Sequence, residues 1–112
     1  MTRPRFSPMF PLCAIALAAA LCSGAASADE YADVVQLARS GKVSEALAKA
    51  NQFIAGQPKD SQMRFVKGVI QRDSGKMAEA IATFTRLTED FPDLPEPYNN
   101  LAVCHAAQGE FD

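Results

Sequence analysis

Two stretches that lie 34 residues apart decide the fold: GKVSEALAKA at 41–50 and GKMAEAIATF at 75–84. Both begin with Gly-Lys and carry Glu-Ala at their centre, and GEFD at 109–112 opens a third copy. Three residue types recur at this interval: the glycines Gly41, Gly75 and Gly109, the alanines Ala46 and Ala80, and the prolines Pro58 and Pro92. Self-similarity at a fixed period of this length is typical of repeat proteins.

After each glycine, apolar residues recur at spacings of three and four, which places them on one face of a helix. In the first copy they are Val43, Ala46, Leu47, Ala50, Phe53 and Ile54, and in the second they are Met77, Ala80, Ile81, Phe84, Leu87 and Phe91. Pro58 and Pro92 then stop these helices. Further helices are expected at about 30–40, 60–74 and 95–108, each before a glycine turn with positive φ.

The sequence therefore predicts an all-α fold of repeated helix-turn-helix units. One such unit cannot bury its apolar face alone, so neighbouring units must stack against each other. Small residues at Ala46, Gly68 and Ala80 suit this, because helices that cross closely leave little room for a side chain.

With this spacing the chain resembles the tetratricopeptide repeat (TPR) family. The second copy carries Gly68, Gly75, Ala80, Phe84 and Pro92 at the spacings of the family pattern. The third carries Tyr98, Leu101, Gly109 and Phe111, and the first carries Leu37, Gly41, Ala46 and Pro58. The expected organisation is a first repeat at 29–58, a second at 59–94 and an incomplete third at 95–112, which makes a TPR solenoid of about two and a half repeats.

The resemblance implies a right-handed stack of helix pairs whose first helices line a concave face that binds an extended peptide or a partner helix. The family positions on that face correspond to Tyr31, Val35, Phe65, Val69, Asn99 and Val103. We expect these residues to form a largely apolar groove with Arg39 or Arg72 at its edge. Asn99 is expected to bind the backbone of the ligand. The chaperone-tail clamp of one TPR subclass is not expected, because no lysine occupies these positions.

A second interpretation of Phe65, Val69 and Val35 assigns them to the core of slightly rotated helices. It arises because Arg64, Lys67 and Gln71 stand where the second copy should have large apolar residues.

The first 28 residues have the form of a secretory signal peptide. Arg3 and Arg5 precede an apolar run at 10–22, and small residues at Ala26 and Ala28 suit cleavage after Ala28. A membrane anchor is the competing interpretation, but the run falls short of the roughly 20 residues that a spanning helix needs. We expect an exported protein, periplasmic or secreted, with no stable membrane span after cleavage.

Composition excludes several classes of function. Arg3 and Arg5 account for two of the 11 basic residues, so nine remain after cleavage against 13 acidic ones, and the mature charge is near −4. Neither sign forms a run, so nucleic acid is not expected as a partner.

Cys104 and His105 are neighbours that point about 100° apart on a helix, and we expect structural roles for both rather than a metal site. A reactive free thiol at Cys104 is the alternative.

No catalytic triad, phosphate loop, cofactor motif or metal-ligand spacing is present, so an enzyme is not expected. Two functions remain open: an exported TPR scaffold or adaptor whose partner is a protein or peptide, or the N-terminal fragment of a longer envelope protein with its activity in a further domain. In both cases Tyr98, Leu101 and His105 lack the second helix of their repeat, which predicts marginal stability or self-association through the third repeat.

Overall fold

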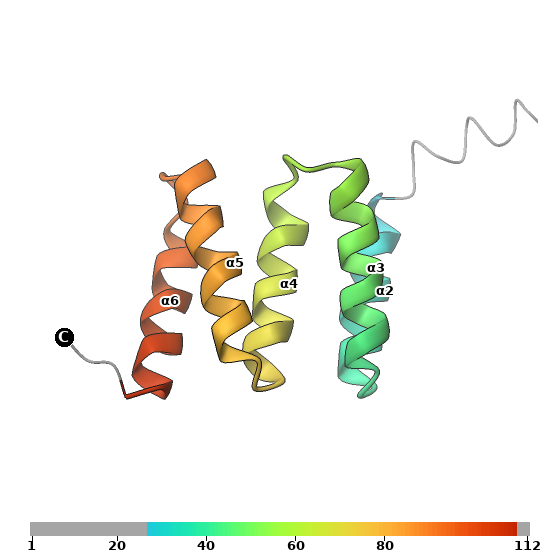
Figure 1. The fold of residues 1–112 in the computed structure, drawn as a ribbon. Coiled ribbons are helices and arrows are strands. Elements are labelled where there is room, and N and C mark those ends of the chain that lie inside the picture. Colours follow the sequence, from blue (N-terminus) through green and yellow to red (C-terminus); the bar gives the residue numbers. More distant parts are fainter. Residues whose placement is uncertain (1–26, 110–112) are drawn as a thin grey trace, which may run out of the picture. The chain divides into compact units, whose positions relative to one another are not determined.

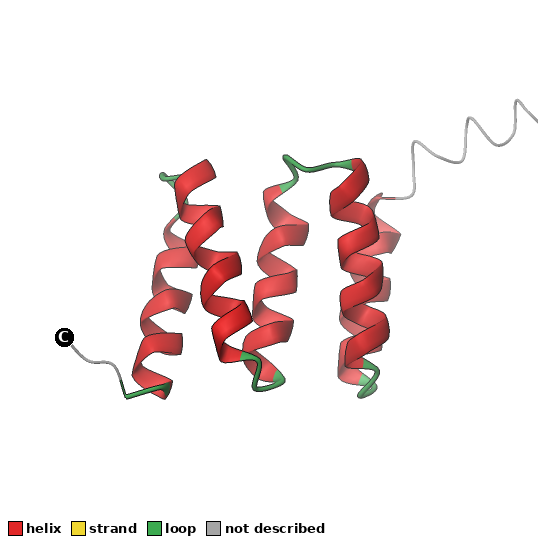
Figure 2. Cartoon of the chain, viewed as in Figure 1, coloured by secondary structure: helices red, strands yellow, loops and turns green. Residues whose placement is uncertain are grey.

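The computed structural model describes residues 27–109, and all regular structure in this range is helical (Figures 1 and 2). The helices are α2 (Ser27–Arg39), α3 (Val43–Gly56), α4 (Ser61–Asp73), α5 (Met77–Asp90) and α6 (Pro95–Ala107). The all-α prediction is confirmed, and the predicted helix limits agree with these to within three residues.

The chain falls into two compact units, and the boundary between them lies between Glu30 and Tyr31. Of the first unit, the described residues are Ser27–Glu30, the first turn of α2. Residues 1–26 of the predicted signal peptide lie outside the described residues. So do Glu110 to Asp112, where the third repeat should begin its second helix. The rest of the description concerns the unit that begins at Tyr31.

The repeated glycines form the same turn at each copy. Gly41 and Gly75 have φ of 84° and Gly109 has φ of 77°, as the sequence predicted. At the first turn the amide of Lys42 donates to the carbonyl of Leu37 at 2.9 Å, and at the second the amide of Lys76 donates to that of Gln71 at 2.8 Å. These bonds satisfy carbonyls that would otherwise be left free at the end of a helix, and they need a residue with positive φ.

The helices form two layers, with the first helices α2, α4 and α6 in one and the second helices α3 and α5 in the other (Figure 1). One cluster of buried side chains joins α2, α3 and α4, and consists of Val34, Ala46, Ala50, Met63 and Ile70. A second joins α5 and α6 through Ala80, Phe84 and Cys104, with Phe65 and Val69 of α4 packed against it. Helix α4 thus belongs to both clusters, which is the stacking that the repeat predicted.

The small residues lie where helices approach each other closely. A Cβ atom at Gly68 would lie 2.6 Å from two ring atoms of Phe84, far inside van der Waals contact. Ala46 and Ala80 are fully buried. The prediction that small residues allow close crossing is confirmed at Gly68.

Polar residues occupy the α4 positions where the family has large apolar ones. Arg64 forms an ion pair with Asp90 at 2.8 Å and lies 5.8 Å from the centre of the Phe91 ring. Gln71 is buried, and its side-chain oxygen accepts a hydrogen bond from Thr83 at 2.7 Å. Both residues face α5 and its C-terminal cap Phe91, so the rotation of α4 that the sequence left open is not needed: these positions tolerate polar side chains because each is satisfied there.

Candidate functional site

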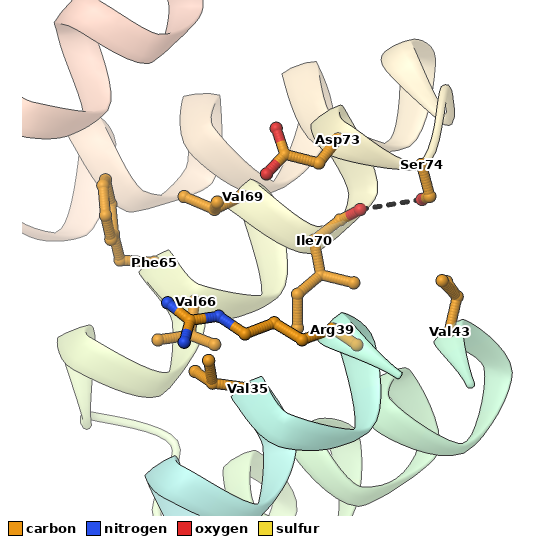
Figure 3. Close-up of a pocket in the computed structure, with 10 residues that line it drawn as sticks. Val35, Arg39, Val43, Phe65, Val66, Val69, Ile70, Asp73 and Ser74 are labelled. Atoms are coloured by element: carbon orange, nitrogen blue, oxygen red, sulfur yellow. Dashed lines mark hydrogen bonds between the residues drawn. The ribbon is translucent and has the colours of Figure 1, made fainter. Parts of the chain in front are cut away.

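A cavity of about 450 Å³ lies between α2, α4 and the start of α3 (Figure 3). It is lined by Val35, Ala38, Arg39, Val43, Phe65, Val66, Val69, Ile70, Asp73 and Ser74. Its walls are mostly valine, isoleucine and phenylalanine, and its charged lining residues are Arg39 and Asp73. Val35, Phe65 and Val69, three of the residues predicted for a binding face, meet in this cavity.

Helical periodicity explains why these side chains converge. Val35 and Arg39 are four residues apart on α2, and Phe65, Val69 and Asp73 follow each other at intervals of four on α4. Residues at this spacing lie one above the other on the same face of a helix. Each helix therefore presents a stripe to the cavity that is apolar at one end and charged at the other.

Phe65 and Val69 belong to the core and to the cavity at once. Both are half-buried and pack against the cluster around Phe84, and the rings of Phe65 and Phe84 lie 5.7 Å apart at an angle of 57°. Both also line the cavity. The core contacts of the second interpretation and the cavity lining of the first therefore occur together at Phe65 and Val69, without a rotation of α4.

Tyr31 does not reach the cavity. Its hydroxyl donates a hydrogen bond of 2.5 Å to Asp60, and its ring lies 5.5 Å from that of Phe53. The hydrogen bond to the carboxylate, followed by burial, raises the pKa of Tyr31 to about 12. Asp60 also caps α4 by accepting from the amide of Met63 at 2.8 Å, so Tyr31 connects α2 to the start of α4 instead of lining a binding face.

Arg72, Asn99 and Val103 also lie outside this cavity. Arg72 forms an ion pair with Asp73 at 2.8 Å and donates to the side-chain oxygen of Asn100. Asn99 is exposed, and so is Val103, at 53% of its surface. Asn100, next to the predicted Asn99, is thus the asparagine that links α6 to α4.

The sequence did not assign Val66 or Ile70 to the site. They directly follow Phe65 and Val69, so the nearly continuous apolar run of α4 was the available signal. A run of this kind gives no indication of which residues border a cavity, because that depends on the distance to α2.

A smaller cavity of about 250 Å³ lies between the N-terminal ends of α4 and α6. It is lined by Ser61, Gln62, Phe65, Leu94, Glu96 and Pro97. Phe65 lines both cavities, so they adjoin each other across α4.

Cys104 is a packed core residue, as the sequence predicted. It is fully buried, and burial raises the pKa of its thiol, an effect that the nearby charge of Arg72 partly offsets. A raised pKa keeps the sulfur as the unreactive thiol at neutral pH. Within residues 27–109 no group of three or more histidine, cysteine or acidic side chains is placed to hold a metal ion.

None of the described helices has both the length and the apolar character needed to cross a bilayer.

Comparison with known proteins identifies the repeat. The family model for the tetratricopeptide repeat matches residues 36–95, more than half of the chain. No curated protein and no solved structure matches the chain significantly. Members of this family are typically scaffolds for protein–protein interaction and not enzymes. The family match, the glycine turns at an interval of 34 residues and the paired helices lead to one conclusion: the chain belongs to the tetratricopeptide repeat family.

Proposed function

We propose that this chain is a protein-interaction module that binds an extended peptide or a partner helix on the face formed by α2, α4 and α6. The observation that carries the proposal is the apolar cavity of about 450 Å³ lined by Val35, Phe65 and Val69. It lies on the first helices, which line the binding face in the family. Its volume falls within the roughly 300–1,000 Å³ that is usual for ligand sites.

The energetics favour a polymeric ligand. Burying one large apolar side chain in such a cavity contributes about 1.5–3 kcal/mol. Association itself costs an estimated 4–15 kcal/mol or more, so one anchored side chain does not give stable binding. A peptide or helix that continues along the neighbouring first helices adds the contacts that a single side chain lacks.

A test uses random segments of about twelve residues displayed with both ends joined to a carrier protein. The full chain is expected to enrich a set of segments. Changing Val35→Thr and Val69→Thr together keeps the shape of the cavity and makes it polar, so binding of the enriched segments should fall about tenfold. Ala78→Ser, on the exposed surface of α5, is the matched control.

Two results would contradict this function. One is the absence of any enriched segment with the unchanged protein. The other is equal binding by the doubly substituted protein and the control, with unchanged helix content in both.

We also propose that the protein is exported to the periplasm or secreted. Arg3, Arg5, the apolar run at 10–22 and the small residues before Asp29 support this location. Expression of the complete reading frame followed by N-terminal sequencing should give Asp29 as the first residue of the exported form. An N-terminal Met1 on protein recovered from the envelope would contradict the proposal.

A second possibility, that the chain is part of a longer envelope protein, is favoured by the surface of α6. Tyr98 is 47% exposed and Val103 is 53% exposed. In the repeat, a second helix packs against each first helix, as α5 packs against α4. A further helix of the same protein, or a second copy, would cover these side chains in the same way.

A further inference from the structure

The linings of the two adjoining cavities carry opposite charges that form no ion pair within the described residues. Arg39 lines the larger cavity and Glu96 lines the smaller one. In residues 27–109 neither side chain takes part in an ion pair, whereas Arg64 pairs with Asp90 and Arg72 pairs with Asp73. An unpaired charge beside an apolar cavity favours a ligand group of opposite charge, since water is displaced around it on binding.

Among the described residues that line the larger cavity, Asp73 is the one acidic residue, and Arg72 already compensates its charge. Arg72 approaches its carboxylate with two nitrogens, at 2.9 and 2.8 Å. In Figure 3 the guanidinium of Arg39 lies near Val66 and Val35, while Asp73 lies beyond Val69. The larger cavity therefore presents a net positive group next to its apolar wall.

Phe65 gives the two cavities a common wall, so an extended ligand that crosses α4 at Phe65 could contact both Arg39 and Glu96. We propose, on the basis of the interaction function above, that the ligand is an extended peptide segment of defined chemistry. It carries an acidic side chain at Arg39, an apolar side chain in the larger cavity and a basic side chain at Glu96, in that spatial order.

The acidic group is a side chain and not a chain end. Within residues 27–109, Arg39 is the single cation that lines the larger cavity, and no amide side chain accompanies it. Capture of a chain terminus uses several converging donors, often backbone N–H groups. One guanidinium on a flexible stem matches one carboxylate on another flexible stem.

The experiment selects segments from the display described above, in which the segments have no free ends. It is run on the full chain and on four variants: Arg39→Glu, Arg39→Gln, Glu96→Lys, and Arg39→Glu together with Glu96→Lys. The unchanged protein is expected to select segments in which an acidic residue precedes or follows an apolar residue with a basic residue on its other side. Arg39→Glu should remove the acidic preference, and Arg39→Gln should weaken binding of the selected segments about threefold to tenfold.

The double variant is the sharpest test, because it keeps the net charge of the face and reverses its direction. Segments selected on the unchanged protein should bind it poorly, and segments with the two charges exchanged should bind it well. Equal helix content in the unchanged protein and in all its variants shows that folding is not the cause.

Several outcomes would overturn the inference while leaving the interaction function intact. One is enrichment of apolar segments without any charge preference. Another is an unchanged selection on Arg39→Glu, which would mean that the charge of Arg39 interacts only with the C-terminal end of α2. A third is binding only of segments with a free C-terminal carboxylate, tested in a second library. If no segment of any kind is enriched, the interaction function itself fails.

Discussion

At the scale of single residues, contacts decide the role of each side chain more than its type does. Gly68 is required by the ring of Phe84, while Gly56 has open space where a side chain would stand. Arg64 and Gln71 are polar residues that serve as packing residues, because Asp90 and Thr83 satisfy them. Tyr31 has the position of a binding residue in the repeat and the contacts of a structural one.

Replacing Gly68 with alanine should destabilise the protein. The new methyl group would meet the buried ring of Phe84 at 2.6 Å, and overpacking of this kind costs about 1–3 kcal/mol. Urea unfolding followed by circular dichroism measures the change. Gly56→Ala, at the end of α3, is the control and should be neutral or slightly stabilising. Equal stability of the two variants would contradict the close contact.

The Tyr31–Asp60 hydrogen bond should make stability depend on alkaline pH. The pKa of Tyr31 in the folded protein is about 12, above the ordinary 10.0, so the folded state keeps its proton more tightly. The contribution of this bond is therefore fully present below about pH 10 and is lost as the pH rises through about 12. Unfolding midpoints measured at pH 8 and at pH 11.5 should differ more in the unchanged protein than in Tyr31→Phe. The same difference in both proteins would refute this.

At the scale of helices, α4 is the element that contributes to both buried clusters. It supplies Met63 and Ile70 to one buried cluster and the packing residues Phe65 and Val69 to the other. It also lines both cavities, through Phe65. The polar contacts of Arg64 and Gln71 fix the face of α4 that packs against α5 and Phe91.

Two arginines, Arg64 and Arg86, approach Asp90. Because they differ in burial, their replacement should destabilise the protein to different extents. Arg64 is 13% exposed, lies 2.8 Å from the carboxylate and stacks near Phe91. Arg86 is 73% exposed and lies 4.0 Å away. Arg64→Ala is therefore expected to cost about 1–2 kcal/mol, and Arg86→Ala less than about 0.5 kcal/mol. Chemical unfolding of both variants tests this, and a larger loss from Arg86→Ala would count against the arrangement.

At the scale of the whole molecule, the unit from Tyr31 onward depends on contacts between neighbouring repeats. Its buried clusters are small, and α4 is common to both. Repeat proteins gain stability from such nearest-neighbour interfaces. The exposed Tyr98 and Val103 on α6 mark the place where the next interface of this kind is expected.

Because α4 joins the clusters, the described helices should unfold together. Val34→Ala, in the first cluster, is expected to cost about 1–2 kcal/mol and to lower protection of amides in α6 as well as in α2. Hydrogen exchange measured residue by residue tests this. Loss of protection confined to α2 and α3 would instead indicate repeats that unfold independently.

The exposed face of α6 predicts association. Val103→Glu places a charge on a side chain that is 53% exposed, so it should leave the fold intact. It should reduce the average mass in sedimentation equilibrium, since like charges would meet in a contact between two copies. If the unchanged protein already has the mass of a monomer, association through this surface is contradicted.

The amino-acid sequence by itself determined the repeat, the helices and their turns. These follow from local physics, because helical periodicity, proline stops and positive-φ glycines act within a few residues. It also indicated that Val35, Phe65 and Val69 lie on one face, because equivalent positions of successive repeats lie on the same side of the stack. Tertiary structure alone decided the rest: that Tyr31 donates to Asp60, that Asn100 and not Asn99 binds Arg72, and that Arg39 lines the cavity without an ion pair to any residue of 27–109. Those outcomes depend on distances between separate helices, which no local pattern encodes.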